Sequence, residues 1–299
     1  MPTHVLKVDS EHGQMRLDVY LTQSLLEAPS RTFVQHLIEA GKVMVNTKAA
    51  KANYKVSTGD AVVVNFSALP RDESIPSENI PLDIIYEDEN ILLINKPAGL
   101  LVHPVNGQNT SGTLVNALLH HCKTLSDVNA EMRPGIVHRL DRETSGIILV
   151  AKDNKAHTKL AKQFERHQIK KKYLALVEGK VEFDEGVVDA SLGKHPRYYD
   201  RKKVSFADEA KAAVTFYRVL RRFKDKTLVA LFPQTGRTHQ LRIHMAYLGH
   251  PVLGDEKYGK KNSFPRLALH AQGIGFVHPY SGQYLEFSIR PPLEFLQLV

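Results

Sequence analysis

The sequence predicts a globular protein that mixes helices with strands and divides into two units. In residues 14–66, apolar residues recur at helical spacing and two short β-like runs follow them. Residues 67–81 carry three prolines among serines and charged residues, which is typical of a linker. In residues 82–299, short runs of branched side chains alternate with amphipathic segments, so a second, larger domain is expected there.

Composition narrows the class of protein. Of the 299 residues, 42% are hydrophobic and 24% charged, which is ordinary for a globular chain. The formal net charge of +8 and a pI near 9.3 indicate a polyanionic partner. The single cysteine, Cys122, excludes an internal disulfide framework and a cysteine-clustered zinc site, and it is typical of a reducing compartment. No apolar run reaches the roughly 18 residues of a membrane span, and no signal peptide is apparent, so a cytoplasmic protein without a membrane partner is expected.

The N-terminal unit is predicted to hold two helices followed by two strands. The first helix carries its apolar residues at helical spacing: Leu17, Tyr20, Leu21 and Leu25. Ser30 is expected to cap the second helix and Gly41 to follow its end. That helix turns four apolar residues inward: Phe33, Val34, Leu37 and Ile38. The strands are expected at Lys42–Asn46 and Ala61–Phe66.

Basic residues surround the second of these helices: Arg31, Lys42, Lys48 and Lys51. A solvated basic face is the ordinary explanation of such residues. However, the unit resembles the S4 RNA-binding domain, in which such a helix and the following Val-x-Val-Asn strand present basic groups to RNA. The resemblance implies that Arg31 and Lys42 contact RNA. Thr47 stands here where that domain usually has a glycine.

The larger unit begins with a predicted hairpin, Ile84–Tyr86 with Ile91–Ile94, and a helix over Thr113–His121. Asp153 is expected to cap a helix that turns Ala156, Leu160 and Phe164 inward. Further strands are predicted at residues 147–151, 173–177, 187–192, 210–220 and 227–232, with a basic loop at residues 197–203. A last helix is expected from its cap Thr238 to Leu248, closed by Gly249.

No metal site is expected. His120, His121 and Cys122 are adjacent on a predicted helix and therefore point in different directions. His239 and His244 are five residues apart and do not share a helical face.

A dense polar segment, residues 138–146, precedes the apolar strand at residues 147–151. If residues 138–141 are extended, Arg139 and Asp141 share one face, with His138 and Leu140 on the other. Buried charge is costly unless it is paired, so the segment must be exposed, tightly paired or functional. Spacing alone favours a surface loop with Asp141 as a turn former.

The string His-Arg-Leu-Asp-Arg-Glu-Thr-Ser-Gly at residues 138–146 closely resembles the catalytic motif of the RluA-type family of RNA pseudouridine synthases. The resemblance implies that Asp141 is the catalytic carboxylate and that Arg139 helps to hold RNA around a flipped uridine. Tyr173 stands in a second family motif, Lys-x-Tyr-x-Ala, where it would pack on the target base and is a proposed proton carrier. Residues 235–244 match a third motif, in which Arg242 would pair with Asp141. Lys96 opens a Lys-Pro-x-Gly element of the same family.

The resemblance covers about residues 82–295 and implies an α+β pseudouridine synthase fold, a mixed and largely antiparallel sheet with a central catalytic cleft. With the S4-like unit, the arrangement is most similar to the D-type branch that acts on the ribosomal large subunit. The catalytic residues it implies are Asp141, Tyr173 and Arg242. RNA contacts are implied for a further set: Arg139, His138, Lys96, Arg237, His239, Leu269, Arg31 and Lys42.

Pseudouridine formation breaks the N1–C1′ bond of a uridine, turns the uracil and rejoins it through C5, so no cofactor is chemically required. The expected partner is large-subunit ribosomal RNA or a ribosomal precursor particle, bound by a monomer. Three roles stay open for Asp141: attack at C1′, addition at C6, or abstraction of the C2′ proton. Modification of tRNA and a non-catalytic RNA-binding or ribosome-assembly factor are the alternatives. A glycosidase that pairs Asp141 with Glu143 fits poorly, because two carboxylates so close in a turn are not assured the required separation.

Overall fold

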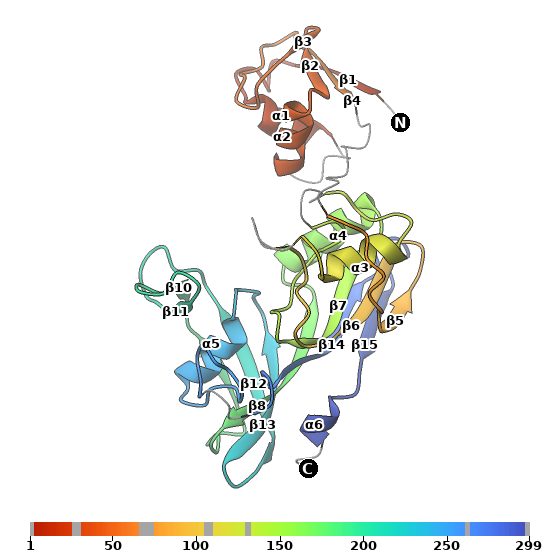
Figure 1. The fold of residues 1–299 in the computed structure, drawn as a ribbon. Coiled ribbons are helices and arrows are strands. Elements are labelled where there is room, and N and C mark those ends of the chain that lie inside the picture. The colour runs from red at the N-terminus through yellow and green to blue at the C-terminus, as the bar shows by residue number, and fades with distance from the viewer. Residues whose placement is uncertain are drawn as a thin grey trace.

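The structure is a computed structural model that describes residues 3–25, 31–65, 75–104, 110–128, 133–260 and 264–296 (Figure 1). The predicted helix cap Ser30, the last predicted strand residue Phe66 and linker residues 67–74 lie outside the described residues. Residues 75–81 were expected to belong to the linker, but they pack against the larger unit. Ile75 is buried in its core, and the Asn116 side chain donates to the Pro76 carbonyl at 2.8 Å.

The N-terminal unit has the two predicted helices, α1 (Leu17–Ser24) and α2 (Arg31–Glu39). They cover an antiparallel sheet in the order β1 (Thr3–Lys7), β4 (Ala61–Asn65), β2 (Val43–Val45) and β3 (Lys48–Ala49). The predicted strands correspond to β2 and β4. β1 was not predicted, and because it pairs with β4 along its whole length, the sheet begins before residue 14. Exposure alternates regularly along β1, but the sequence does not reveal it, because the apolar Val5 lies on the outer face and is 69% exposed.

The turn between β2 and β3 has left-handed backbone at two consecutive residues, with φ of 48° at Asn46 and 71° at Thr47. A two-residue hairpin of this kind favours Asn followed by Gly, because both residues need positive φ. Asn46 fits and holds the turn: its side-chain amide donates to Asp60 at 2.7 Å, and its oxygen accepts from the Ala61 amide at 2.9 Å. Thr47 adopts the conformation that the usual glycine would adopt, at the cost of β-branched side-chain strain.

The larger unit is built on one nine-stranded sheet in the order β5-β6-β7-β14-β8-β13-β12-β9, with β15 also paired to β14. Its strands are β5 (Ile84–Glu87), β6 (Ile91–Lys96), β7 (Ser145–Ala151), β8 (Lys170–Glu178), β9 (Glu185–Asp189), β12 (Val214–Arg222), β13 (Lys226–Pro233), β14 (Leu269–Val277) and β15 (Tyr284–Ser288). Every pairing is antiparallel except that of β7 with β14. The expected mixed, largely antiparallel α+β sheet is thus confirmed.

Helices cover both faces of the part of this sheet that contains β7 (Figure 1). On one face, α3 (Leu114–His121) packs against Ile148 and Val150. On the other, α4 (Asn154–Glu165) packs against Ile147 and Leu149. Since successive strand residues point to opposite faces, β7 is buried along its whole length. This is why the polar residues before it lie at the edge of a rigid core.

α5 (Gln240–Tyr247) packs its apolar residues on β8 and β13, and the short α6 (Leu293–Leu296) contributes Phe295 to the same core. The start of α5 differs from the prediction. Its N-cap is His239 with φ of 57°, and not Thr238. The Gln240 side chain instead holds the turn before the helix, because its oxygen accepts from the Thr235 hydroxyl at 2.7 Å and from the Arg237 amide at 3.0 Å.

The predicted basic loop at residues 197–203 is in part a small hairpin of β10 (Leu192–Lys194) and β11 (Lys202–Val204). No helix among the described residues has the length and apolar character needed to cross a membrane.

β7 and β14 meet through only two residue pairs, Ser145 with His270 and Gly146 with Ala271. Gly146 has φ of 113°, and a Cβ atom on it would lie 2.3 Å from the Ala271 carbonyl oxygen. Only glycine permits this approach. The Ser145 hydroxyl and His270 Nδ1 lie 2.9 Å apart and fasten the same junction. This junction joins the two halves of the sheet, and the polar segment before β7 enters it.

Candidate active site

A cleft of about 520 Å³ lies where the segment before β7, the end of α4, the start of β8 and the segment before α5 meet. Eight of the eleven side chains predicted from the sequence line it: His138, Arg139, Asp141, Tyr173, Arg237, His239, Arg242 and Leu269. The other three, Lys96, Arg31 and Lys42, do not. Most of the side chains predicted from the sequence therefore line one cleft, although they come from segments that lie far apart in the chain.

The segment that carries Asp141 is held by its buried neighbour. Leu140 is buried in the core against α3, whereas Arg139 is exposed, as alternation predicts. A turn then follows, in which the Thr144 amide donates to the Asp141 carbonyl at 3.1 Å. The Asp141 side chain keeps 21% of its surface exposed and faces the cleft.

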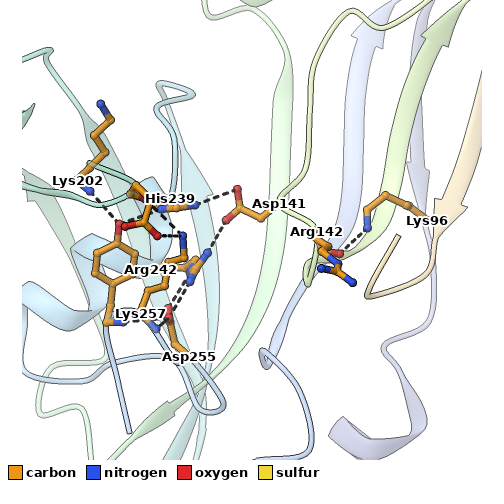
Figure 2. A network of polar contacts seen from close by, with 10 residues as sticks. Lys96, Asp141, Arg142, Lys202, His239, Arg242, Asp255 and Lys257 are labelled. Carbon is orange, nitrogen blue, oxygen red and sulfur yellow. Dashed lines mark hydrogen bonds and ion pairs between the residues drawn. The ribbon is translucent and has the colours of Figure 1, made fainter. Parts of the chain in front are cut away.

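Asp141 and Arg242 form the predicted pair. Arg242 Nη1 donates to Asp141 Oδ2 at 3.1 Å across 101 residues of sequence (Figure 2). The other Asp141 oxygen, Oδ1, accepts no hydrogen bond from the described residues, and His239 Nε2 lies 3.9 Å from it. One oxygen of the carboxylate is thus fixed and the other is available in the cleft.

Asp255 was not predicted to be a site residue, although it holds Arg242 more firmly than Asp141 does. Arg242 Nε and Nη2 donate to its two oxygens at 2.7 and 2.8 Å (Figure 2). Burial would lower the pKa of the Arg242 guanidinium, but Asp255, and after it Asp141, outweighs burial and raises that pKa. Burial would raise the pKa of Asp255, but the bonds from Arg242 lower it. Both groups are therefore charged.

His239 and Tyr258 close one side of this network. His239 Nδ1 lies 2.9 Å from the Tyr258 hydroxyl, and the Tyr258 ring lies beside the Arg242 guanidinium at 5.2 Å. Burial lowers the pKa of His239, against the opposing effect of Asp141. The imidazole is therefore mainly neutral near pH 7.

Tyr173 lies on β8, where it pairs with Leu231 on one side and Ala271 on the other, and its side chain lines the cleft with Leu269. Burial, and after it the charge of Asp141, raises the pKa of the Tyr173 phenol above its usual range. The side chain therefore presents a neutral ring to any occupant of the cleft.

Lys171 was not singled out within the basic run Lys170–Lys172. It lines the cleft, donates to the Thr235 carbonyl at 3.2 Å, and burial lowers its pKa to about 8. Strand alternation in β8 could have identified Lys171, because it places this side chain on the opposite face from Lys170 and Lys172.

His138 lies in the cleft wall as a neutral ring. Its Nε2 accepts from the Leu149 amide at 2.8 Å, and the ring stacks on Phe164 with centroids 4.8 Å apart. Burial, with a smaller effect of Lys171, lowers its pKa to about 3. These contacts fix β7 against α4 and leave the ring no positive charge to offer to a phosphate.

Lys96 does not lie where the sequence placed it. It was expected to contact RNA, but its side chain is fully buried and donates to three carbonyls: Pro97 at 2.7 Å, Leu100 at 2.9 Å and Arg142 at 3.0 Å. Burial lowers its pKa to about 8. The position contradicts direct RNA contact. Lys96 instead ties the segment after β6 to the residue that follows Asp141.

Arg139 and Arg237 are exposed on the cleft wall, and Arg237 Nε donates to the Ala212 carbonyl at 3.1 Å. Arg31 and Lys42 lie in the N-terminal unit. Lys42 is exposed. The Arg31 side chain is 50% exposed and pairs with the buried Asp18 at 2.9 Å, so its guanidinium is partly committed to its own domain.

The described residues contain no group of three His, Cys, Asp or Glu side chains that could hold a metal ion. Within the predicted cluster at the end of α3, His121 Nε2 lies 2.9 Å from Glu87 Oε2, and Cys122 is buried in the core. Of these three residues, only Cys122 packs in the core as the sequence predicted, because His120 and His121 are exposed.

Two protein families match the chain. The family RNA pseudouridylate synthase matches residues 90–247, and the S4 domain matches residues 15–62. The first match includes Asp141, Tyr173 and Arg242, and the second falls on the N-terminal unit.

Whole-chain relatives agree with these matches. The uncharacterized RNA pseudouridine synthase YlyB of Bacillus subtilis is 43% identical, over 98% of this chain and 96% of its own length. The ribosomal large subunit pseudouridine synthase D of Nitrosomonas europaea is 44% identical, over 94% of this chain and 82% of its own. Among solved structures, human RNA pseudouridylate synthase domain containing 1 superposes with a TM-score of 0.60 at 26% identity, covering 73% of this chain and 86% of its own.

Proposed function

Because the chain belongs to the RluA-type family of RNA pseudouridine synthases, and is thus an isomerase that acts on RNA, we propose that it converts specific uridines of large-subunit (23S) ribosomal RNA to pseudouridine. Asp141 is the proposed catalytic carboxylate. The observation that carries this proposal is the carboxylate itself, which lies in a cleft with one oxygen held by Arg242 and the other without a hydrogen-bond partner among the described residues.

The geometry fits the demands of the chemistry. A carboxylate that reacts at the ribose–uracil junction must stay ionised in a cleft that excludes water, and a guanidinium partner favours the ionised form and fixes its orientation. Each of the three roles open to Asp141 uses an oxygen that is not already bound. Oδ1 meets this requirement.

Tyr173 supports the detached uracil in this proposal. Its ring lines the cleft, and a planar aromatic face is suited to stacking on a base. A role as acceptor of the C5 proton needs a phenolate, and the raised pKa of Tyr173 disfavours the phenolate near pH 7. We therefore assign Tyr173 to holding the base, and expect Tyr173→Phe to keep most of the turnover that Tyr173→Ala loses.

The cleft volume of about 520 Å³ lies within the usual range for sites that take small molecules, about 300–1,000 Å³, so one everted nucleotide fits. Extruding a base costs a few kcal/mol. Arg139, exposed at the cleft, is the proposed residue that fills the vacated stack and so offsets part of that cost.

The ribosomal large subunit is the proposed source of the RNA because a relative that is 44% identical over 94% of this chain is named for that subunit. The S4 domain and the net charge of +8 support a structured RNA partner. In this proposal Arg31 and Lys42 contribute RNA contacts from the N-terminal unit, and the protein acts as a monomer in the cytoplasm.

The test uses RNA labelled with tritium at uridine C5, which the reaction must release. The full chain is incubated with transcripts of the large-subunit RNA, the small-subunit RNA and tRNA, and modified uridines are mapped in RNA from a deletion strain. We expect release from large-subunit RNA. Release from tRNA alone would overturn the proposal that large-subunit RNA is the substrate. No release from any cellular RNA by the folded protein would overturn the proposed activity.

Asp141→Asn should retain RNA binding and lose turnover, since the amide keeps the shape and loses the charge. The matched control is Glu143→Gln, two residues away, with a side chain that is 51% exposed. It should release tritium at the wild-type rate. Equal turnover by Asp141→Asn would remove Asp141 from the catalytic role.

A further inference from the structure

Asp255 is a buried carboxylate whose hydrogen bonds are all internal. Its Oδ2 accepts from Arg242 Nε at 2.7 Å. Its Oδ1 accepts from Arg242 Nη2 at 2.8 Å and from the backbone amides of Lys257 and Tyr258 at 2.9 and 3.1 Å. The Asp255 side chain has no exposed surface. A carboxylate so buried and so fully bonded has one fixed orientation.

The loop before Asp255 is equally constrained. Gly254 has φ of 70°, and a Cβ atom on it would lie 2.0 Å from the Arg266 carbonyl oxygen. Only glycine allows the loop to lie this close to the segment that leads into β14. The backbone thus delivers the Asp255 oxygens to one place beside α5.

The geometry of the guanidinium makes this orientation important. An arginine presents its five N–H groups as a rigid planar fork and binds a carboxylate preferentially through two parallel bonds. Asp255 takes the two-bond arrangement with Nε and Nη2. Only Nη1 then reaches Asp141, and it makes a single bond at 3.1 Å (Figure 2).

We propose that Asp255 is a positioning residue that limits Arg242 to one bond with Asp141 and so keeps the second oxygen of Asp141 available for reaction. This inference rests on the proposed function of Asp141. In the absence of Asp255, Asp141 is the nearest remaining carboxylate, and the guanidinium turns to engage both of its oxygens. The reacting group is then sequestered although every member of the Asp141–Arg242 pair is present.

Charge supports the same conclusion. Asp141, Arg242 and Asp255 together carry one net negative charge, so the guanidinium is already neutralised by Asp255 and does not fully quench Asp141. The Tyr258 ring lies beside the Arg242 guanidinium at 5.2 Å, a distance at which an aromatic face attracts a cation.

Two variants test the inference. Asp255→Asn keeps an oxygen for the two backbone amides but turns an NH2 group toward Arg242 Nε. Asp255→Ser keeps a hydroxyl near those amides and removes both guanidinium acceptors. Thermal melting first establishes that each variant folds. We expect single-turnover tritium release to fall about 100-fold, the scale of a misplaced catalytic group, with RNA binding unchanged.

A double-mutant cycle with Arg242→Lys distinguishes the proposed positioning role of Asp255 from a purely structural one, because lysine lacks the planar fork that Asp255 is proposed to restrain. The double variant Asp255→Asn with Arg242→Lys should turn over at the rate of Arg242→Lys alone. The matched control is Glu294→Gln, which breaks the ion pair with Arg266 at 2.6 Å outside the cleft and should leave turnover unchanged.

Wild-type turnover by either folded Asp255 variant would overturn the inference. So would a double variant that is slower than Arg242→Lys by the same factor by which Asp255→Asn is slower than the wild type. Failure of both variants to fold would also overturn it, since Asp255 would then be a determinant of stability. The proposed function fails by a different result: no tritium release by the wild-type chain, or full release by Asp141→Asn.

Discussion

Replacing Lys96 by methionine should destabilise the larger unit and slow turnover, although Lys96 does not line the cleft. The Lys96 ammonium is bound by the carbonyls of Pro97, Leu100 and Arg142 at 2.7, 2.9 and 3.0 Å. Methionine has nearly the same length and volume and no donor. The packing is therefore preserved while the three bonds are lost.

The magnitude follows from which carbonyls lose their only partner. The Arg142 carbonyl still accepts from the Gly99 amide at 2.9 Å. The Pro97 and Leu100 carbonyls are left unpaired within the described residues. A fully buried unpaired carbonyl costs about 1–3 kcal/mol, and the cost is smaller here because Leu100 is half-buried and Pro97 is exposed. Removing a buried charge offsets part of this loss, so we expect a net cost of about 2 kcal/mol. A domain of this size loses about 2–4 °C in melting temperature per kcal/mol, which gives a shift of about 4–8 °C.

Calorimetric melting of the full chain measures this shift, because it separates the transition of the larger unit from that of the S4 domain. Lys123→Met is the matched control, since Lys123 is exposed in the same unit and its replacement should leave the transition in place. Single-turnover tritium release should also fall, because Lys96 holds the residue next to Asp141. A melting temperature within about 2 °C of the wild type would refute the reasoning.

Three other outcomes are expected. Burial lowers the pKa of Lys96 to about 8 from 10.5, so the unfolded chain binds more protons than the native chain between these pH values. Urea unfolding should therefore show that the stability of the wild type, relative to that of Lys96→Met, rises by about 3 kcal/mol from pH 8 to pH 10.5. A stability difference that does not change with pH would contradict this expectation. Gly146→Ala should leave little folded enzyme, because its Cβ would lie 2.3 Å from the Ala271 carbonyl oxygen; a wild-type circular dichroism melt would disprove this. Thr47→Gly should stabilise the N-terminal unit by about 1 kcal/mol, since it relieves a φ of 71° at a β-branched residue, as a higher denaturant midpoint for that unit's transition would show.

The sequence predicted best where one local pattern determines the structure. The core of β7 follows from a short run of apolar, mostly branched residues, and the inward faces of the N-terminal helices follow from helical periodicity. The pairing of Asp141 with Arg242 was predicted through the family resemblance, because no periodicity connects residues separated by 101 positions.

Other features depend on tertiary contacts. Asp255 follows Gly254 in the sequence, but its two bonds to Arg242 depend on where the loop packs. The left-handed His239 depends on the Gln240 side chain. Lys96 is different: it shares a strand face with the buried Leu92 and Ile94, so strand alternation pointed to its burial. The expectation of an exposed lysine prevailed because buried lysines are rare.

The narrow junction between β7 and β14 has a consequence for biosynthesis. Ser145 and His270 are 125 residues apart, a distance that a translating ribosome covers in about 6–25 s. During that interval β7 has emerged without β14, the strand that completes its pairing, and an unpaired strand edge invites association with other chains. The nascent enzyme therefore passes through a vulnerable period that ends only when β14 has been made, and catalytic competence arrives together with that protection.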